Sequence, residues 1–387
     1  MTNKLNNLIT ESLNNYKANN LYRSLNINNN NILNFCDNDY LGLRNNKTIQ
    51  NLIKNNLSKY PIGSGASHLI SGHHDIHTKL ENLLCDFTSY ESTLLCSTGY
   101  MANLAIITAL NKITNKKLYL YHDRFNHASL IDATLLNNIN FSRYKHNDLD
   151  HLELLIQKNQ NKLPDGTVSF IVTEGLFSMD GDRPDLEKLL YLKKKYNLYI
   201  ILDNAHDFLV NIDNHKLIKQ TADIYMATLS KAAGGFGAFV AGSQIFTESL
   251  RQFARSYIYT TAISPLLTYA NYELVKEAIN NNEIRTKLNN NIKYFTKLAL
   301  ENNINININI NIINNNLSHI QPILINNNEK ALRVSENLKN NNILITAIRY
   351  PTVPKNLSRL RVTLSARHNY SDIENLIKYL HQTLRIS

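Results

Sequence analysis

The chain has few cysteines and no long apolar run. Its three cysteines, Cys36, Cys85 and Cys96, contain no Cys-x-x-Cys pair, and any disulfide scheme leaves one of them unpaired. This usage is typical of free thiols in a reducing compartment, and it makes a metal site built on them improbable. No stretch approaches the roughly 18 uncharged apolar residues of a membrane span, and the first residues lack the apolar block of a secretory signal. The sequence therefore predicts a cytoplasmic protein without a membrane-embedded part.

Asparagine and positive charge are in excess. About 60 of the 387 residues are asparagine, in predicted helices, strands and loops alike, and we interpret them as compositional drift at exposed positions. Lys and Arg number 41 against 31 for Asp and Glu, a formal charge of +10. A nucleic-acid-binding protein would concentrate this charge in a stripe, whereas the densest run, residues 193–195, lies in an ordinary amphipathic pattern. We expect an anionic small-molecule substrate or cofactor and no nucleic-acid partner.

The hydrophobic pattern predicts three parts: a helical arm and loop over residues 1–50, a large α/β domain over 51–270 and a small α+β domain over 271–387. In the large domain, helical patterns alternate with short apolar strands at 118–121, 168–172, 199–202 and 239–241. Such alternation indicates an α/β fold with a doubly wound, mostly parallel sheet whose faces are both covered by helices.

The C-terminal part begins with a long predicted helical stretch near 265–300. Four Asn-Ile repeats follow at 303–310, and we interpret their strict period of two as a half-buried strand in preference to a low-complexity expansion. The remainder predicts strands at 320–325, 343–348 and 359–364, and helices at 330–338 and 371–384.

Polar residues cluster where three predicted strands of the large domain end. Asp203 and His206 follow one apolar strand, and Lys231 lies in a Ser- and Gly-rich turn after another. Ligands bind at the carboxyl ends of the strands in a doubly wound sheet. A lysine that forms a Schiff base and a carboxylate that faces a ring nitrogen suit pyridoxal 5′-phosphate, provided that burial lowers the pKa of the lysine.

The spacing of these residues alone is also consistent with purely structural roles. Asp203 could cap a turn, His206 could be a core histidine and Lys231 a surface lysine. The pair His73 and His74 resembles part of a metal site, but no third ligand stands at a suitable spacing. We expect a loop there and no bound metal.

Taken together, the motifs along nearly the whole chain resemble those of the α-oxoamine synthases. These are fold-type I pyridoxal-phosphate transferases that condense an amino acid with an acyl thioester. The segments that carry the resemblance are residues 38–43, 63–67 with 71–72, 97–103, 122–130, 143–148, 173–182, 203–206 and 228–237. So many ordered motifs are implausible by chance.

The resemblance implies a role for each matched residue. Lys231 would form the Schiff base, Asp203 would pair with the pyridine nitrogen, and His127 would stack on the ring and act in catalysis with both. The ring hydroxyl would face His206 and Ser178, and the phosphate would face Gly99, Tyr100 and Thr228. Arg361 would bind the amino-acid carboxylate, a task that suits the planar guanidinium. Arg23 and Thr352 would also contact substrate. A homodimer is implied, with Thr260 or Thr261 reaching the phosphate of the neighbouring subunit.

The C-terminal segments 320–323, 346–354 and 359–364 resemble the branch that condenses L-alanine with a pimeloyl thioester in biotin synthesis. The acyl carrier, coenzyme A or acyl carrier protein, stays open. A glycine-using sibling of the glycine C-acetyltransferase or 5-aminolevulinate synthase type remains the alternative. A non-catalytic subunit of this fold is opposed by the presence of Lys231.

Two departures from the family pattern stand beside the predicted site. Asn204 occupies a position where the family often has a second acid. Residues 207–212, Asp-Phe-Leu-Val-Asn-Ile, replace a glycine-rich stretch after His206. The geometry of this loop is therefore in doubt.

Overall fold

A computed structural model describes residues 4–19, 21–23, 25, 27, 32–306, 318–350, 352–354 and 356–386. The chain forms two compact units, Met1–Leu33 and Asn34–Ser387. The first contains helix α1 (Lys4–Ala18), where the periodicity of leucines predicts a helical arm. The boundaries proposed at 50 and 270 remain a prediction. Among the described residues, no helix is long and apolar enough to cross a bilayer.

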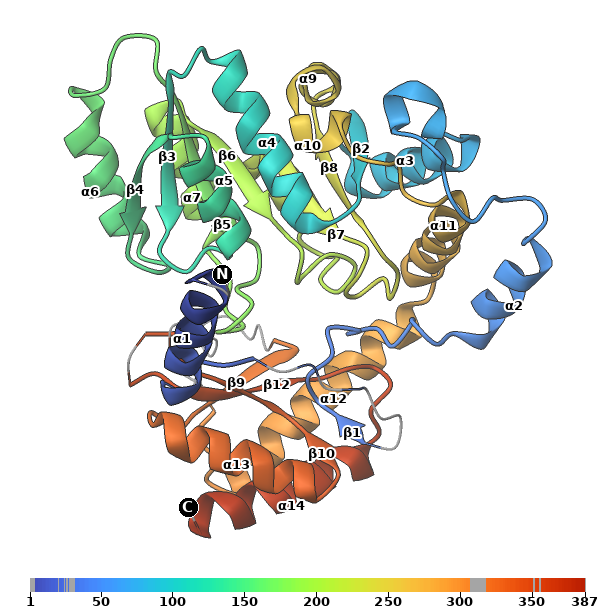
Figure 1. Ribbon diagram of the computed structural model, residues 1–387, viewed down its shortest axis with the longest axis vertical. Coiled ribbons are helices and arrows are strands. Elements are labelled where there is room, and N and C mark those ends of the chain that lie inside the picture. Colours follow the sequence, from blue (N-terminus) through green and yellow to red (C-terminus); the bar gives the residue numbers. More distant parts are fainter. Residues whose placement is uncertain are drawn as a thin grey trace. The chain divides into compact units, whose positions relative to one another are not determined.

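A seven-stranded sheet dominates the second unit, in the order β2-β8-β7-β6-β5-β3-β4 (Figure 1). Neighbours from β4 to β7 are parallel, whereas β8 is antiparallel to both β7 and β2. The predicted doubly wound, mostly parallel sheet is confirmed. Its strands are β2 (Ser92–Cys96), β3 (Leu118–Asp123), β4 (Asn140–Tyr144), β5 (Val168–Glu174), β6 (Tyr199–Asp203), β7 (Ile224–Thr228) and β8 (Ala238–Gly242).

Helices and one π-helical turn connect and flank these strands. In chain order they are α2 (Lys47–Asn55), η1 (His68–Gly72), α3 (Asp75–Thr88), α4 (Gly99–Ile113), α5 (Ala128–Leu136), α6 (Leu149–Gln160), α7 (Leu186–Tyr196), α8 (His215–Thr221), α9 (Gln244–Phe253), α10 (Arg255–Ile258) and α11 (Pro265–Asn280).

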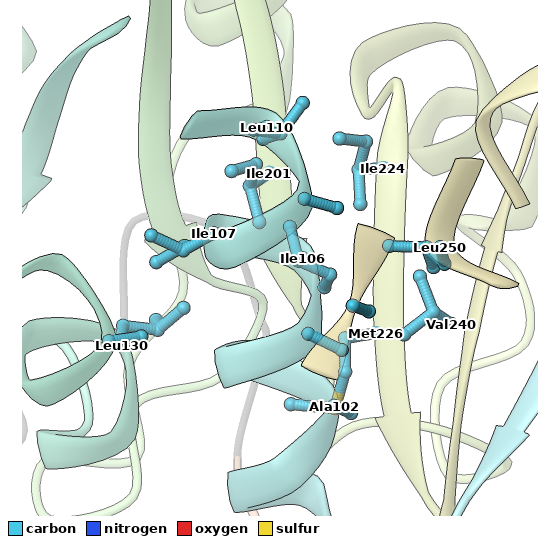
Figure 2. Close-up of a cluster of buried hydrophobic side chains, with 14 of the residues drawn as sticks. Ala102, Ile106, Ile107, Leu110, Leu130, Ile201, Ile224, Met226, Val240 and Leu250 are labelled. Atoms are coloured by element: carbon cyan, nitrogen blue, oxygen red, sulfur yellow. The ribbon is translucent and has the colours of Figure 1, made fainter. Parts of the chain in front are cut away.

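Two apolar clusters cover the two faces of the large sheet. Strand β5 divides its side chains between them by the two-residue alternation of a strand: Phe170 and Val172 join one cluster and Ile171 the other. The first cluster contains residues of α4, including Ile106 and Ile107, packed on the strands (Figure 2). The second contains residues of α6 and α7. Burial on both faces explains why these strands read as continuous apolar runs.

The C-terminal part is built around a three-stranded antiparallel sheet in the order β11-β12-β9. Its elements are α12 (Asn282–Glu301), β9 (Ile320–Leu324), α13 (Asn328–Asn340), β10 (Ile343–Leu344), β11 (Thr346–Ile348), β12 (Arg359–Thr363) and α14 (Tyr370–Ile386). Helix α12 continues from α11 toward this sheet (Figure 1). Strand β10 instead pairs with β1 (Leu33–Asn34).

Two predictions for this part need correction. The helical stretch over 265–300 is two helices, because Asn281 adopts an extended backbone (φ −101°, ψ 90°) between α11 and α12. The single strand predicted over 343–348 is two strands that belong to different sheets. Of the Asn-Ile repeats, Ile306 forms one antiparallel bridge with Ile323, and 307–310 lie outside the described residues.

Asparagine is more than drift at exposed positions. Of the eleven non-glycine residues described with positive φ, eight are asparagine, and Asn197 ends helix α7 in the left-handed conformation. Asparagine tolerates this conformation better than most residues do. With only 12 glycines in the chain, asparagine takes many of the turns and helix ends where glycine is usual.

Candidate active site

Acidic residues end two neighbouring central strands. Glu174 closes β5 and Asp203 closes β6, and the two are register partners in the parallel pair. Both side chains are buried. One oxygen of Asp203 accepts a hydrogen bond from the Asn103 side chain at 2.8 Å, and the other accepts from the Ala205 backbone N–H at 3.0 Å. Burial and the nearby Asp203 raise the pKa of Glu174 well above its usual value. The edge of the sheet thus holds a buried carboxylate pair.

Lys231 lies in the turn that follows β7. The turn is closed by backbone hydrogen bonds from Leu229 to Gly237 and from Gly234 to Lys231. Gly234 has φ +72°, and a Cβ there would lie 2.5 Å from the Arg44 backbone nitrogen, so the turn requires glycine. Burial lowers the pKa of Lys231 to about 8, against the opposing effects of Asp203 and Glu174. The lysine therefore faces the carboxylate pair as an amine that is partly neutral near neutral pH.

His206 follows Asp203 on the same loop. Its Nδ1 hydrogen-bonds the Tyr40 hydroxyl at 2.6 Å, and its carbonyl accepts from His319 Nε2 at 2.9 Å. Burial and the neighbouring Lys231 lower the pKa of His206 well below its usual value. A neutral imidazole is therefore fixed beside the lysine.

Arg361 is a buried residue of β12 that reaches the loop after β5. Its Nε donates to the Ser178 carbonyl and its Nη2 donates to the Asn38 side chain at 3.2 Å. Its charge contributes to the low pKa values of Lys231 and His206. The structure thus brings Arg361, Ser178, His206 and Lys231 into one neighbourhood, as the resemblance implies.

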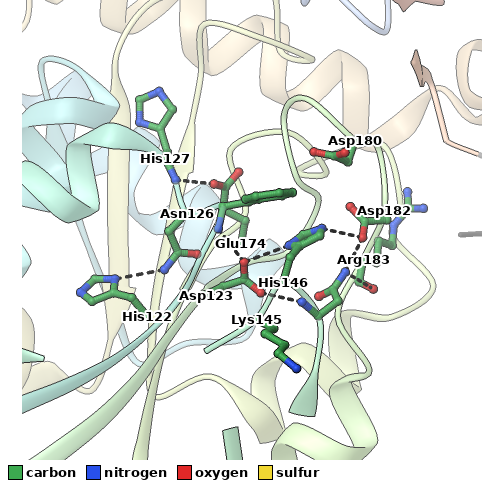
Figure 3. Close-up of polar contacts among 12 residues, drawn as sticks. His122, Asp123, Asn126, His127, Lys145, His146, Glu174, Asp180, Asp182 and Arg183 are labelled. Atoms are coloured by element: carbon green, nitrogen blue, oxygen red, sulfur yellow. Dashed lines mark hydrogen bonds and ion pairs between the residues drawn. The ribbon is translucent and has the colours of Figure 1, made fainter. Parts of the chain in front are cut away.

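His127 is held at the start of α5. Its backbone N–H donates to the Glu174 carboxyl at 2.6 Å (Figure 3). Its Nδ1 bonds the Ser129 hydroxyl at 2.8 Å. The side chain itself is exposed. Glu174 therefore fixes the backbone from which an accessible imidazole projects.

Gly99 and Tyr100 begin helix α4, where Thr98 caps the helix by accepting from the Met101 N–H. Such an N-terminus favours an anionic group. Tyr100 is exposed and donates to Asp132 at 3.0 Å. Thr228 is buried at the end of β7 and bonds Ser230 at 2.7 Å. A phosphate held here would meet the helix N-terminus and a hydroxyl of the lysine turn.

Two predicted substrate contacts stay predictions. Thr352 is exposed in the loop after β11, where its N–H donates to the Arg349 carbonyl, and the adjacent Pro351 lies outside the described residues. Arg23 is exposed in the first unit, Met1–Leu33.

Three residues of the site were not singled out from the sequence: Glu174, Asn103 and Tyr40. Glu174 carried a usable signal, because it is an acid directly after an apolar strand, as Asp203 is. Tyr40 and Asn103 lie in the motif segments 38–43 and 97–103, but no local pattern indicated their partners, since each contacts a residue 100 or more positions away.

His146 joins two loops beside the site. Its ring nitrogens bond Asp123 and Asp182, each at 2.9 Å (Figure 3). Phe125 stacks on its ring. Burial alone would lower the pKa of His146, but the two carboxylate contacts outweigh burial and raise it to about 10. A protonated His146 therefore ties the loop that carries His127 to the loop that follows Ser178.

The departures after Asp203 have a structural account. Asn204 donates to the Tyr225 hydroxyl at 3.0 Å. A Cβ on residue 175 would lie 1.9 Å from the side-chain oxygen of Asn204, so this packing requires glycine at position 175. Leu209 is fully buried and keeps φ +66°, a conformation that favours glycine. The chain therefore retains a left-handed turn beside the site although the expected glycines are missing.

The prediction that no third histidine lies near His73 is wrong, because His73 belongs to a cluster of three histidines. Ligand atoms of His68, His73 and His77 lie within 4.8 Å of one another, and His74 is not among them. Both ring nitrogens of His77 are already engaged by backbone groups, the His74 N–H at 2.9 Å and the Ile263 carbonyl at 2.7 Å. His77 has no lone pair left for a metal, so we interpret the cluster as hydrogen-bonded histidines that hold the local chain and not as a metal site.

The donor set fits pyridoxal phosphate. A lysine with a lowered pKa faces a buried carboxylate, a neutral histidine flanks both, and the N-terminus of a 15-residue helix can receive a phosphate. Together with the α/β sheet, these features define the class of pyridoxal-phosphate-type transferases.

Comparison with known proteins gives the family. Residues 30–380 match the family described as aminotransferase class I and II, and the chain belongs to this family. It is 39% identical over 357 residues to the 8-amino-7-oxononanoate synthase of Methylobacillus flagellatus, covering 91% of this chain and 86% of the relative. The protein of the same name from Hydrogenovibrio crunogenus is 40% identical over 358 residues, covering 91% and 87%.

Solved structures agree on the fold. The crystal structure of 8-amino-7-oxononanoate synthase from Francisella tularensis has a TM-score of 0.74 at 30% identity and covers 92% of this chain and 99% of that one. Serine palmitoyltransferase of Sphingomonas wittichii has a TM-score of 0.87 at 21% identity, covering 100% and 98%. The predicted fold-type I architecture is therefore confirmed.

Proposed function

We propose that the protein is a pyridoxal-phosphate-dependent acyltransferase that condenses L-alanine with a pimeloyl thioester. The products would be 8-amino-7-oxononanoate, CO2 and the free thiol carrier, a step of biotin synthesis. The observation that carries this proposal is a half-buried Lys231 within electrostatic reach of Asp203 and Glu174, in a chain whose curated relatives bear this enzyme's name.

Bound pyridoxal phosphate would supply an electron sink for a carbanion at the amino-acid Cα. Lys231 would hold the cofactor covalently before substrate arrives, and its Nζ would then take the Cα proton and later return one. A pKa near 8 suits this exchange of protons close to neutral pH. Asp203 would pair with the protonated ring nitrogen, and the hydrogen bonds from Asn103 and Ala205 orient its two oxygens.

Other residues would bind and orient. Arg361 would bind the alanine carboxylate through its guanidinium, and the exposed ring of His127 would cover one face of the cofactor. Ser178 and His206 would face the ring hydroxyl, while Gly99, Tyr100 and Thr228 would hold the phosphate. The alanine Cα would then attack the thioester carbonyl, the thiol would leave, and the alanine carboxyl would depart as CO2. Holding the two substrates together accounts for much of the expected acceleration.

We propose a homodimer as the working form. Exposed apolar side chains gather on two segments that are joined by hydrogen bonds from Ala262 to Ala66 and from Leu266 to Pro61. These side chains are Ile62, Leu69, Ile70, Tyr259 and Leu267. Apolar side chains exposed on two adjoining segments suit burial against a second copy of the chain. Sedimentation of the purified protein would measure its mass, and a monomer at micromolar concentration would contradict this part of the proposal.

A competition assay tests the reaction. Alanine and glycine are offered together, with pimeloyl, acetyl or succinyl thioester, each on coenzyme A and on acyl carrier protein. We expect the pair of alanine and pimeloyl thioester to have the highest kcat/KM. One methyl group in an apolar pocket is worth about 1–3 kcal/mol, so glycine should be disfavoured by roughly 10- to 200-fold. Faster turnover of glycine with acetyl or succinyl thioester would instead assign a sibling activity.

A further inference from the structure

Asn103 lies at the centre of a buried polar chain that joins the two sides of the site. It is fully buried on α4, and its amide nitrogen is 2.8 Å from Asp203 Oδ2 and 2.8 Å from Ser129 Oγ. Ser129 Oγ is in turn 2.8 Å from His127 Nδ1. The chain of contacts therefore runs from the carboxylate Asp203 through Asn103 and Ser129 to the imidazole of His127.

The directions of these hydrogen bonds follow from the donors. An amide nitrogen only donates, so each of its two hydrogens serves one partner, Asp203 or Ser129. Because Ser129 Oγ accepts from Asn103, its own hydrogen is available to His127 Nδ1. The Ser129 backbone N–H also points at Nδ1, at 3.2 Å. Nδ1 of His127 is thus an acceptor, which places the ring proton on Nε2.

The opposite orientation of the amide is unfavourable. Turning Asn103 over would bring its oxygen against the Asp203 carboxylate, two acceptors without a proton between them. In the observed orientation the Asn103 oxygen is buried without a hydrogen-bond partner. Leaving an amide oxygen unsatisfied costs free energy, and the two hydrogen bonds that the amide nitrogen donates offset this cost.

We infer that Asn103 is a positioning residue that orients the Asp203 carboxylate and, through Ser129, fixes the tautomer of His127. This inference rests on the proposed function, because it assigns Asp203 to the cofactor's ring nitrogen and His127 to its face. A single side chain then orients the carboxylate on one side of the cofactor and sets the tautomer of the imidazole on the other.

The test compares Asn103→Leu, which keeps the branching at Cγ but removes both donors, with Asn111→Leu as a matched control. Asn111 lies on the same helix and donates to the Asn137 carbonyl at 3.1 Å, away from Asp203. Exchange of the alanine α-hydrogen with solvent is measured without acyl donor, together with the pH dependence of pyridoxal-phosphate binding to cofactor-free protein. We expect Asn103→Leu to slow exchange by about 10- to 100-fold and to shift the pH profile of binding, because a hydrogen bond to a charged group is lost. The control should match wild type in both.

Ser129→Ala separates the effect of Asn103 on Asp203 from its effect on His127. It removes the link to His127 and keeps the bond from Asn103 to Asp203, so exchange should slow less than in Asn103→Leu. If Asn103→Leu does not fold, Asn103→Ser, which retains a single donor, takes its place with the same expected direction.

Wild-type exchange and an unchanged pH profile in the Asn103 variant would overturn the inference, whatever its melting temperature. Failure of the proposed function is distinguishable, because the wild-type protein itself would then neither bind pyridoxal phosphate nor exchange the alanine α-hydrogen.

Discussion

Arg183 donates two hydrogen bonds to Asp207, from Nε to Oδ2 at 2.9 Å and from Nη2 to Oδ1 at 2.7 Å. The side chains are 13% and 4% exposed, so this is a buried ion pair with two-point geometry. Asp207 directly follows His206. The pair therefore anchors the segment in which this chain lacks the expected glycines.

Removing one partner of this pair should be costly. Arg183→Leu leaves the Asp207 carboxylate buried without its counter-charge, and we expect the free energy of unfolding to fall by about 3–5 kcal/mol. The double variant Arg183→Leu/Asp207→Asn removes both charges and should lose clearly less. Urea unfolding of the three proteins measures the differences. Equal losses in the single and double variants would show that the pairing of charges is not what matters there.

Leu209 allows a test of backbone strain at its φ of +66°. Both Leu209→Ala and Leu209→Gly remove a fully buried side chain, at about 2–5 kcal/mol. Only glycine adopts this conformation without the penalty of roughly 1–2 kcal/mol, so the glycine variant should be the more stable of the two.

Leu189 is the matched control, because it is fully buried in the regular helix α7. There the order should invert, with alanine more stable than glycine by about 0.5–1 kcal/mol. Thermal unfolding of the four variants gives the two differences, and the same order at both positions would contradict the account of Leu209.

His146 should make stability depend on pH. Its pKa is raised to about 10 in the folded protein, above the ordinary value of 6.5. A raised pKa contributes stability that is fully present below pH 6.5 and is lost as pH rises toward 10. The free energy of unfolding should therefore decrease across this window, with a limit of about 1.4 kcal/mol for each unit of pKa difference.

His146→Gln keeps a side chain that can donate hydrogen bonds but does not titrate. Its stability should be lower near pH 6 and should vary less between pH 6.5 and 10 than that of wild type. Parallel pH profiles for the two proteins would assign the dependence to other groups.

Lys231 should react with pyridoxal phosphate in a way that follows its own pKa. Reaction with the cofactor's aldehyde requires the neutral amine, and the pKa of Lys231 is lowered to about 8. The rate of covalent incorporation, trapped with borohydride and located by mass spectrometry, should rise with pH and level off above about 8. An ordinary lysine would keep rising toward about 10.4.

Lys231→Ala should abolish this incorporation and all turnover. Lys188→Ala is the control, since Lys188 is a half-buried helix residue paired with Asp150 and remote from the turn after β7. Incorporation that persists at another lysine in Lys231→Ala, with activity retained, would remove Lys231 from its proposed role.

The sequence by itself determined the layers of the fold and two anchors of the site. Apolar runs at 118–121, 168–172 and 199–202 predict central strands because side chains buried on both faces leave no polar alternation. Asp203 and Lys231 could be found because each follows such a run, and parallel strands bring their carboxyl ends to one edge. These signals are local, within a few residues along the chain.

Only the tertiary structure decided which distant side chains complete the site. Asn103 meets Asp203 across 100 residues, Tyr40 meets His206 across 166, and Arg361 reaches Ser178 across 183. No periodicity records such contacts, because they depend on strand order and on how the small sheet packs beside the large one. The left-handed turn at Leu209 could not be predicted from the sequence for a related reason. Its residue type argues against that conformation, and the surrounding contacts impose it.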